Sequence, residues 1–278
     1  MPRPRVRRTE AIVLRERDYA EADRILTLLT PGGKVTVMAK GVRRPTSRKT
    51  GHLGLFNRAE IMLAQGRNMD LVTQAQALEV FEELWHDLLR FTYACYAAEL
   101  VDRFVPEDEG SSDLYDLLVS ALRWFSTGDD LRLWCRYFEL SLLRQTGYAP
   151  SLHRCVVCEG DLQAETNYFD LAQGGLACPR CGMQIPGARP VSLSAQKVLR
   201  YLDSRDMASV GMLSLRESSQ REIETLMHAV LQYTLERELK STAFLRRLRS
   251  ELAMREASRQ KPEGSAKPPV FDDQPDSA

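Results

Sequence analysis

The segment RILTLLTPGGKVTVMAKGV, residues 24–42, determines the fold of the first third of the chain. Two runs rich in Val, Ile, Leu and Thr flank Thr30-Pro31-Gly32-Gly33, and Pro and Gly in these positions favour a tight turn. The segment therefore predicts a β-hairpin. Three further runs of similar composition lie at 9–16, 56–65 and 70–81. Five strands without a helix among them predict a small barrel, for which the oligonucleotide-binding (OB) fold is the leading candidate.

From residue 82 onward the apolar residues recur at helical spacing. This pattern predicts helices at 85–104, 112–125, 131–147 and 192–204. A longer helix is predicted to begin near Ser219, with Ser219 and Glu222 as a capping box. Its predicted apolar face consists of Ile223, Leu226, Met227, Val230, Leu231, Thr234 and Leu235.

The fold class that these patterns predict is α+β, with two domains and a tail. The expected boundaries are 1–81 for the barrel and 82–252 for an α-helical domain. Residues 253–278 are rich in Pro and small residues and end in an acidic stretch, so they are predicted to be disordered.

A formal net charge of zero hides a strong asymmetry. Residues 1–80 contain 15 Lys and Arg against 8 Asp and Glu, a balance of +7, whereas residues 81–150 contain 6 against 13, a balance of −7. The two parts are therefore expected to have different partners. Every apolar run is interrupted by charged residues, and the N-terminus lacks the apolar segment of a signal peptide, so a cytoplasmic location without membrane association is expected.

Four of the six cysteines form two CxxC pairs, Cys155 with Cys158 and Cys178 with Cys181, in the pattern C-x2-C-x19-C-x2-C. This spacing is typical of zinc sites, where each tight turn directs two thiolates at one ion. The pattern predicts one structural zinc ion in a module at 153–187, with a redox dithiol as the alternative. Four thiolates leave no open coordination position, so the zinc is not expected to be catalytic.

The sequence contains no motif of a common enzyme class: GxxxxGK[ST], GxGxxG, HExxH and GxSxG are all absent. The acidic run Glu107-Asp108-Glu109 could hold Mg²⁺ for a nuclease. Pro106 and Gly110 on either side of it instead indicate a solvated loop between helices. We therefore expect a protein without catalytic activity.

A basic stretch, KGVRRPTSRKTGHLG at 40–54, contains no acidic residue, and Pro45 and Gly51 keep it out of a regular strand. On a barrel it would be a loop that presents cations, hydroxyl groups and backbone amides to a phosphate backbone. Because few aromatic residues accompany it, binding should be mainly electrostatic and weak in sequence preference. The candidate DNA contacts are Lys40, Arg43, Arg44, Arg48 and Lys49, together with Arg15 and Arg17 in the same basic, strand-rich part of the chain.

Four stretches in this order resemble the bacterial RecO family of recombination mediators. They are TEAIVLRERDYAEADRILTLLTPGGKV, MAKGVRRPTSRKTGHL, the paired CxxC motifs and LQYTLERELKSTAFL, and the resemblance extends over residues 8–250. The resemblance implies an OB domain that binds single- and double-stranded DNA, and a helical domain that carries the zinc module. It also implies annealing of complementary strands and a partnership with RecR. Finally, it implies assistance to RecA loading on strands coated by single-stranded DNA-binding protein.

The chain departs from the family pattern at one point, just after the basic loop. The family pattern has Pro-Phe after the basic loop, where this chain has Leu55-Phe56. As a separate hypothesis, an apolar groove near Leu235 to Leu245 receives an acidic protein tail, with Arg246, Arg247 and Arg249 as its cations.

Two other functions are compatible with the residues alone. One is a zinc-containing RNA-binding or translation factor, which would bind structured RNA more tightly than DNA. The other is the Mg²⁺-dependent nuclease that the acidic run would allow.

Overall fold

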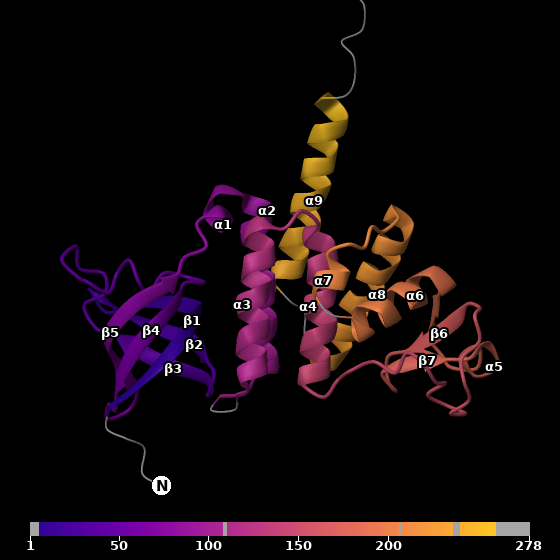
Figure 1. Ribbon diagram of the computed structural model, residues 1–278, viewed down its shortest axis with the longest axis horizontal. Helices are drawn as coiled ribbons and strands as arrows, with labels where there is room; N and C mark the ends of the chain where they lie inside the picture. Colours follow the sequence, from indigo (N-terminus) through magenta and orange to yellow (C-terminus); the bar gives the residue numbers. More distant parts are fainter. Residues whose placement is uncertain (1–5, 108–109, 206, 236–239, 260–278) are drawn as a thin grey trace, which may run out of the picture.

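The computed structural model of the protein describes residues 6–107, 110–205, 207–235 and 240–259. The chain is α+β, as the sequence predicts, and Figure 1 shows the strands β1 to β5 at one end, the cysteine-containing module at the other and most of the helices between them. Within the described ranges, no helix combines the length and the apolar character that a membrane crossing requires.

The five predicted strands are present and form a closed barrel with the order β1-β2-β3-β5-β4. Their bounds are β1 (Val6–Tyr19), β2 (Asp23–Thr30), β3 (Gly33–Ala39), β4 (Arg58–Ala64) and β5 (Asp70–Glu79). The predicted hairpin joins β2 and β3, with Thr30 opposite Gly33. The Thr30 hydroxyl donates to the Gly33 carbonyl at 2.8 Å, and Gly33 has a φ of 123°, which favours glycine.

One side of the barrel packs against the helices. Ala11 and Val13 of β1 lie in the barrel core, whereas Ile12 and Leu14 of the same strand lie in the apolar core of the helical part. Successive side chains of a strand point to opposite faces, so both faces of β1 are buried here. Leu29 of β2 also belongs to the helical core, and helices α2 and α3 contact β1 and β2. The helical part therefore covers the β1–β2 side of the barrel (Figure 1).

The predicted helices are confirmed, with short additions. The bounds are α1 (Glu83–His86), α2 (Leu88–Phe104), α3 (Ser112–Thr127), α4 (Leu131–Gln145), α6 (Leu193–Ser204), α7 (Met207–Val210), α8 (Glu217–Leu235) and α9 (Lys240–Arg259). Asp87, Ser111, Asp130 and Ser192 cap α2, α3, α4 and α6 by accepting hydrogen bonds from backbone amides of the first turn. Such caps satisfy amides that the helix leaves unpaired.

The predicted start of the long helix is wrong in one respect. Helix α8 begins at Glu217, and Glu222 lies inside it instead of capping it. The Glu222 carboxylate accepts hydrogen bonds from the backbone amide and the hydroxyl of Ser192, both at 2.6 Å, and so joins α8 to the start of α6. The predicted apolar face of α8 is confirmed, since Ile223 and Leu231 are fully buried.

The predicted boundary of the disordered tail is also wrong. Helix α9 continues to Arg259, so residues 253–259 are helical. The remaining tail residues, 260–278, lie outside the described part of the chain.

The cysteine-containing module has a small sheet that the sequence patterns did not indicate. Its elements are β6 (Asn167–Asp170), β7 (Gly175–Ala177), α5 (Pro179–Gly182) and β8 (Arg189–Val191), and the strand order is β7-β6-β8. Ser151 forms a bridge with Gly175, and β8 ends at Val191. The structured module is therefore longer at both ends than the predicted 153–187.

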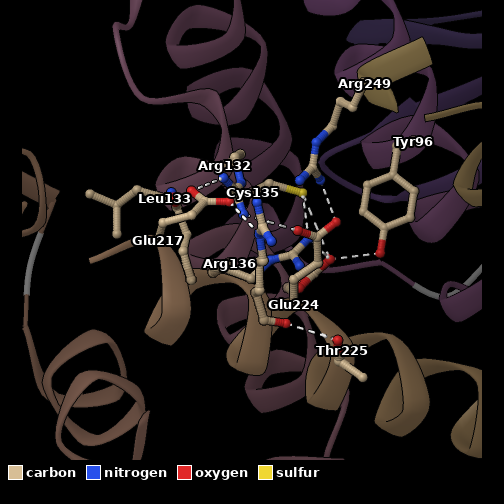
Figure 2. A network of polar contacts seen from close by, with 12 residues as sticks. Tyr96, Arg132, Leu133, Cys135, Arg136, Glu217, Glu224, Thr225 and Arg249 are labelled. Atoms are coloured by element: carbon tan, nitrogen blue, oxygen red, sulfur yellow. Dashed lines mark hydrogen bonds and ion pairs between the residues drawn. The ribbon is translucent and has the colours of Figure 1, made fainter. Parts of the chain in front are cut away.

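A buried ion pair joins two turns of α4, and Figure 2 shows its arginine, Arg136, within a network of polar contacts. Arg136 and Glu139 are 7% and 0% exposed, and the Arg136 Nη2 lies 2.6 Å from Glu139 Oε1. The Tyr96 hydroxyl of α2 donates to the same oxygen at 2.6 Å. Burial raises the pKa of Glu139, and the Arg136 guanidinium opposes this rise. Arg136 also donates to the Cys135 sulfur of the same helix at 3.2 Å. The bond between Tyr96 and Glu139 connects α2 and α4 through polar groups within an apolar core.

The network continues to α8 and α9 (Figure 2). Glu224 of α8 pairs with Arg249 of α9 and, at 3.5 Å, with Arg132 of α4. Arg132 also pairs with Glu217 at 2.7 Å. Arg249, one of the predicted partner-binding cations, is therefore held by a carboxylate of the helical part itself.

Changing Glu139→Gln keeps the shape of the side chain but leaves the Arg136 charge buried without its carboxylate. Loss of one member of a buried pair costs about 3–5 kcal/mol, so the free energy of unfolding measured with urea should fall by this amount. As a control, Arg247→Ala removes an exposed pair with Glu251 and should leave the urea midpoint unchanged. Equal stability of Glu139→Gln and the natural protein would contradict a stabilising role for the pair.

Candidate nucleic-acid interface and metal centre

The predicted basic stretch lies in the connection between β3 and β4, residues 40–57, which we call the basic loop. Backbone hydrogen bonds fold it into successive turns, including Ser47 N–H to Arg44 O at 2.9 Å and His52 N–H to Lys49 O at 3.1 Å. Two apolar side chains of the loop, Val42 and Leu53, are 2% exposed and belong to the barrel core. The loop is thus anchored at several points on the barrel.

The loop also covers an edge of β5. Strands β3 and β5 pair only at Val37 with Asp70 and at Met38 with Leu71. Farther along β5, the Lys49 ammonium donates to the Val72 carbonyl at 3.0 Å, and His52 Nδ1 accepts from the Ala77 amide at 3.2 Å. The loop therefore supplies partners to backbone groups of β5 where β3 no longer pairs with it.

Lys49 has a structural role in this arrangement. Its ammonium also donates to the Lys40 carbonyl at 2.9 Å, so it ties the start of the basic stretch to residue 49. Partial burial lowers the pKa of Lys49, and the Asp23 charge opposes this shift.

The end of the loop is held by Phe56, which is 2% exposed. Its φ is 66°, a left-handed conformation that costs a residue other than glycine about 1–3 kcal/mol. The Phe56 amide donates to the Val13 carbonyl at 2.9 Å, and its ring lies 5.6 Å from that of Phe91 in α2. Packing against both the barrel and α2 compensates for the strained backbone. The Leu55-Phe56 pair thus connects the loop to the helical part.

The predicted cations divide into two groups. Four of them are exposed and form no ion pair with any residue that the structure describes: Arg17, Lys40, Arg44 and Arg48. Arg43 is exposed and lies 3.4 Å from Asp18. Arg15 is also exposed, but it lies 3.6 Å from Asp102 of α2 and donates to the Thr27 hydroxyl at 3.4 Å, so it links the barrel to the helical part.

Beside the loop, the outer face of β4 and β5 is hollowed into a cavity of about 490 Å³. Arg48 and Lys49 line it together with polar residues that the sequence analysis did not select. These are Arg8, Glu60, Thr73, Gln74 and Gln76. A signal for the last two is present in the sequence, because polar and small residues alternate in QAQA, residues 74–77, as on a strand with one exposed face.

The four predicted metal ligands come together in the cysteine module. Their Sγ atoms all lie within 4.8 Å of one another, and the Cys158 and Cys178 sulfurs are 4.0 Å apart. A tetrahedral ion with bonds of about 2.3 Å would place its sulfur ligands about 3.8 Å apart. The donor set therefore fits a single metal ion.

Local backbone geometry aims the thiols at this point. Glu159, with a φ of 57°, donates its amide to the Cys155 carbonyl at 2.9 Å, and Gly182 donates to the Cys178 carbonyl at 2.7 Å. A Cβ on Gly182 would lie 2.4 Å from the Cβ of Tyr168, so a larger residue would displace this turn. Both CxxC pairs thus occur in tight turns, as their spacing predicts.

The thiols of the cluster differ in how readily they ionise. Burial alone would raise the pKa of Cys155, but the amides of Cys158, Cys178 and Val157 lower it to about 6. Hydrogen bonding to Cys178, together with burial, raises the pKa of Cys181 to about 12. A cation at the centre would favour the ionised form of all four thiols.

The acidic run gives no comparable cluster. The Glu107 carboxylate accepts from the Thr36 hydroxyl at 3.1 Å, and Asp108 and Glu109 lie outside the described residues. Among the residues that are described, the four cysteines form the group of three or more side chains suited to a metal ion.

A small closed barrel with a basic loop, joined to a helical part with a cysteine cluster, defines a scaffold of the kind used by nucleic-acid-binding proteins. Comparison with known families gives a more specific result. The model "Recombination protein O N terminal" matches residues 5–81, and "Recombination protein O C terminal" matches residues 85–243. The chain therefore belongs to the RecO family.

Individual relatives agree with this assignment. The chain is 43% identical over 250 residues to the DNA repair protein RecO of Roseiflexus sp. (strain RS-1), covering 90% of this chain and 88% of the relative. It is 37% identical over 250 residues to the DNA repair protein RecO of Dehalococcoides mccartyi (strain ATCC BAA-2100 / JCM 16839 / KCTC 5957 / BAV1), covering 90% and 98%. The corresponding values for the DNA repair protein RecO of Pelotomaculum thermopropionicum are 38% over 241 residues, covering 86% and 93%.

Elemental mass spectrometry of the purified protein should detect one metal ion per chain. Cys155→Ser removes the buried thiol ligand, so the metal content should fall close to zero and the melting temperature should drop, because bound metal contributes to folding. Cys95→Ala, in α2 and outside the cluster, should retain one ion. A natural protein without metal but with a disulfide in either CxxC pair would instead support the redox dithiol.

Proposed function

We propose that the protein is a recombination mediator in DNA repair, without catalytic activity, that binds single- and double-stranded DNA with little sequence preference. The observation that carries this proposal is the basic loop, which holds the exposed cations Lys40, Arg44 and Arg48 on a rigid barrel in a member of the RecO family. The barrel's strand order and its parallel β3–β5 pair support an OB fold.

The charge distribution supports a physical mechanism for this role. Cations of the loop neutralise phosphates and release counterions, so a bound strand is repelled less by a complementary one and the two can anneal. The acidic helical part, with a balance of −7 over residues 81–150, repels DNA and leaves its own surfaces to protein partners. We propose RecR as a partner, together with single-stranded DNA-binding protein, in the loading of RecA, and a cytoplasmic location at the nucleoid.

We further propose that the metal of the cysteine cluster is zinc and that it is structural. Four thiols within reach of one ion are a donor set that zinc favours, and such a site leaves no position for a substrate. The module lies at the opposite end of the molecule from the barrel (Figure 1), which supports a role as scaffold and not as part of the loop's DNA site.

Three cations of α9 were proposed to bind an acidic protein tail, and two of them, Arg246 and Arg247, remain candidates. Arg247 is exposed and lies 2.9 Å from Glu251, a pair that an incoming carboxylate could replace. Arg249 is engaged by Glu224, and the side chain of Arg246 lies outside the described residues. Undiminished binding of the C-terminal peptide of single-stranded DNA-binding protein to an Arg246→Ala, Arg247→Ala variant would remove this part of the proposal.

The variant Lys40→Ala, Arg44→Ala, Arg48→Ala tests the loop. It removes three exposed cations that form no ion pair with the residues that the structure describes. Binding to a labelled single strand should weaken. The slope of log Kobs against log salt should fall in magnitude by about 2, since each phosphate contact contributes about 0.7.

The matched control is Arg205→Ala, Arg216→Ala, Arg255→Ala, which removes three exposed cations of the helical part. Its slope should equal that of the natural protein. An unchanged slope in the loop variant would contradict the proposed site, and tighter binding to structured RNA than to DNA of equal length would favour an RNA-binding function.

A further inference from the structure

The outer surface of the barrel is only partly available to a ligand. OB folds commonly bind oligonucleotides on the face of strands 2 and 3. In this chain, Leu29 of β2 lies in the helical core, α3 contacts β2, and the Thr36 hydroxyl of β3 is bonded to Glu107. The helical part therefore occupies much of the face that the fold would ordinarily use. Most of the face of β4 and β5 lies on the far side of the barrel from α3 (Figure 1), although Glu79 at the end of β5 pairs with Arg123 of α3 at 2.7 Å.

The cavity of about 490 Å³ lies on this available face. The strand register places Arg8 of β1 opposite Met62 of β4, and Met62 opposite Gln74 of β5, so these three residues form a row across the strands. Glu60 and Gln76 form the next row, which continues on β1 to Glu10, whose carboxylate pairs with Arg58. We call this surface the outer trough. It comprises Arg8, Glu60, Met62, Thr73, Gln74 and Gln76, with Arg48 and Lys49 of the basic loop beside them.

The side chains of the outer trough differ from those of a purely electrostatic surface. Arg8 and Arg48 are cations for phosphates, whereas the amides of Gln74 and Gln76 are neutral donors and acceptors that suit base edges. The Met62 thioether is a favourable neighbour for an aromatic ring, and a base offers one. A duplex keeps its base faces stacked inside, so this combination matches an unpaired strand better than a paired one.

One acidic residue lies within the outer trough. Glu60 pairs with the exposed Arg8, and this contact raises the pKa of Arg8. A bound phosphate would therefore compete with Glu60 for Arg8. Glu60 thus weakens the attraction of the trough for a nucleic-acid backbone.

We propose that a single strand of DNA crosses the outer trough on β1, β4 and β5 beneath the basic loop, instead of following the β2–β3 face. This inference rests on the proposed DNA binding of the loop and adds the path of the strand and the residues that contact its bases. It also assigns to Glu60 the role of an internal competitor for phosphate.

The first test places carboxylates in the trough with the variant Gln74→Glu, Gln76→Glu. Both glutamines are exposed on β5, so the fold should persist, as a thermal melt will verify. Affinity for an oligo-dT strand at low salt should fall about tenfold or more, because carboxylates repel phosphate and lose the amide donors. Affinity for a duplex of equal length should change less. The control Gln145→Glu, Gln173→Glu makes the same change in charge at exposed positions of the helical part and of the cysteine module and should bind normally.

The second test removes the competitor. Glu60→Gln frees Arg8, so affinity for the single strand should rise and the salt slope should grow in magnitude by about 0.7. The double change Glu60→Gln, Arg8→Ala should abolish this gain.

Each outcome separates the path from the proposed function. The proposed path would be overturned if Gln74→Glu, Gln76→Glu and Glu60→Gln both bound the single strand like the natural protein while the triple loop variant still showed a smaller salt slope. The loop alone would then be the DNA site. An equal loss for duplex and single strand in Gln74→Glu, Gln76→Glu would overturn the preference of the trough for unpaired bases. If the triple loop variant also kept the affinity and salt slope of the natural protein, the proposed function itself would be contradicted.

Discussion

The arrangement of the molecule depends on the burial of both faces of β1. Ala11 and Val13 pack inside the barrel, and Ile12 and Leu14 pack into the helical core, so one strand belongs to two cores. Burial of a large aliphatic side chain contributes about 1.5–3 kcal/mol, and several such side chains hold the barrel in a fixed orientation against the helices. Which side of the barrel faces solvent, and where the basic loop lies, both follow from this contact.

The basic residues of the barrel differ in how far contacts within the protein engage them. Arg15, near the covered side, has Asp102 as a partner, and Lys49 holds the loop on β5. Lys40, Arg44 and Arg48 are exposed on a loop whose end is fixed by Phe56. A loop that is already folded by backbone hydrogen bonds and anchored on the barrel needs less ordering when it binds, so its cations can contribute more of their interaction energy to affinity.

Local patterns in the sequence predicted much of this structure. The turn at Thr30–Gly33, the five strands, the main helices and the convergence of the four cysteines depend on residues close in the chain or on metal-ligand spacing, and all are present. The contact of Glu222 with Ser192 and the buried pair beside Tyr96 depend on how distant segments pack, which spacing does not encode.

The sequence also contains a signal that both faces of β1 are buried. Ala11 to Leu14 form a continuous apolar run instead of an alternating one, and such a run is typical of a strand covered on both faces. The short strands β6, β7 and β8 had no comparable signal, because three or four residues are too few to show a period.

In the proposed arrangement, the helices cover the β1–β2 side of the barrel and the nucleic acid binds the outer trough on β4 and β5. Photocrosslinking tests it most directly, with a photoreactive amino acid placed in turn at Gln76 on β5 and at Met38 on the outward side of β3. A bound single strand should crosslink efficiently from position 76 and poorly from position 38. Efficient crosslinking from position 38 with none from position 76 would contradict the account.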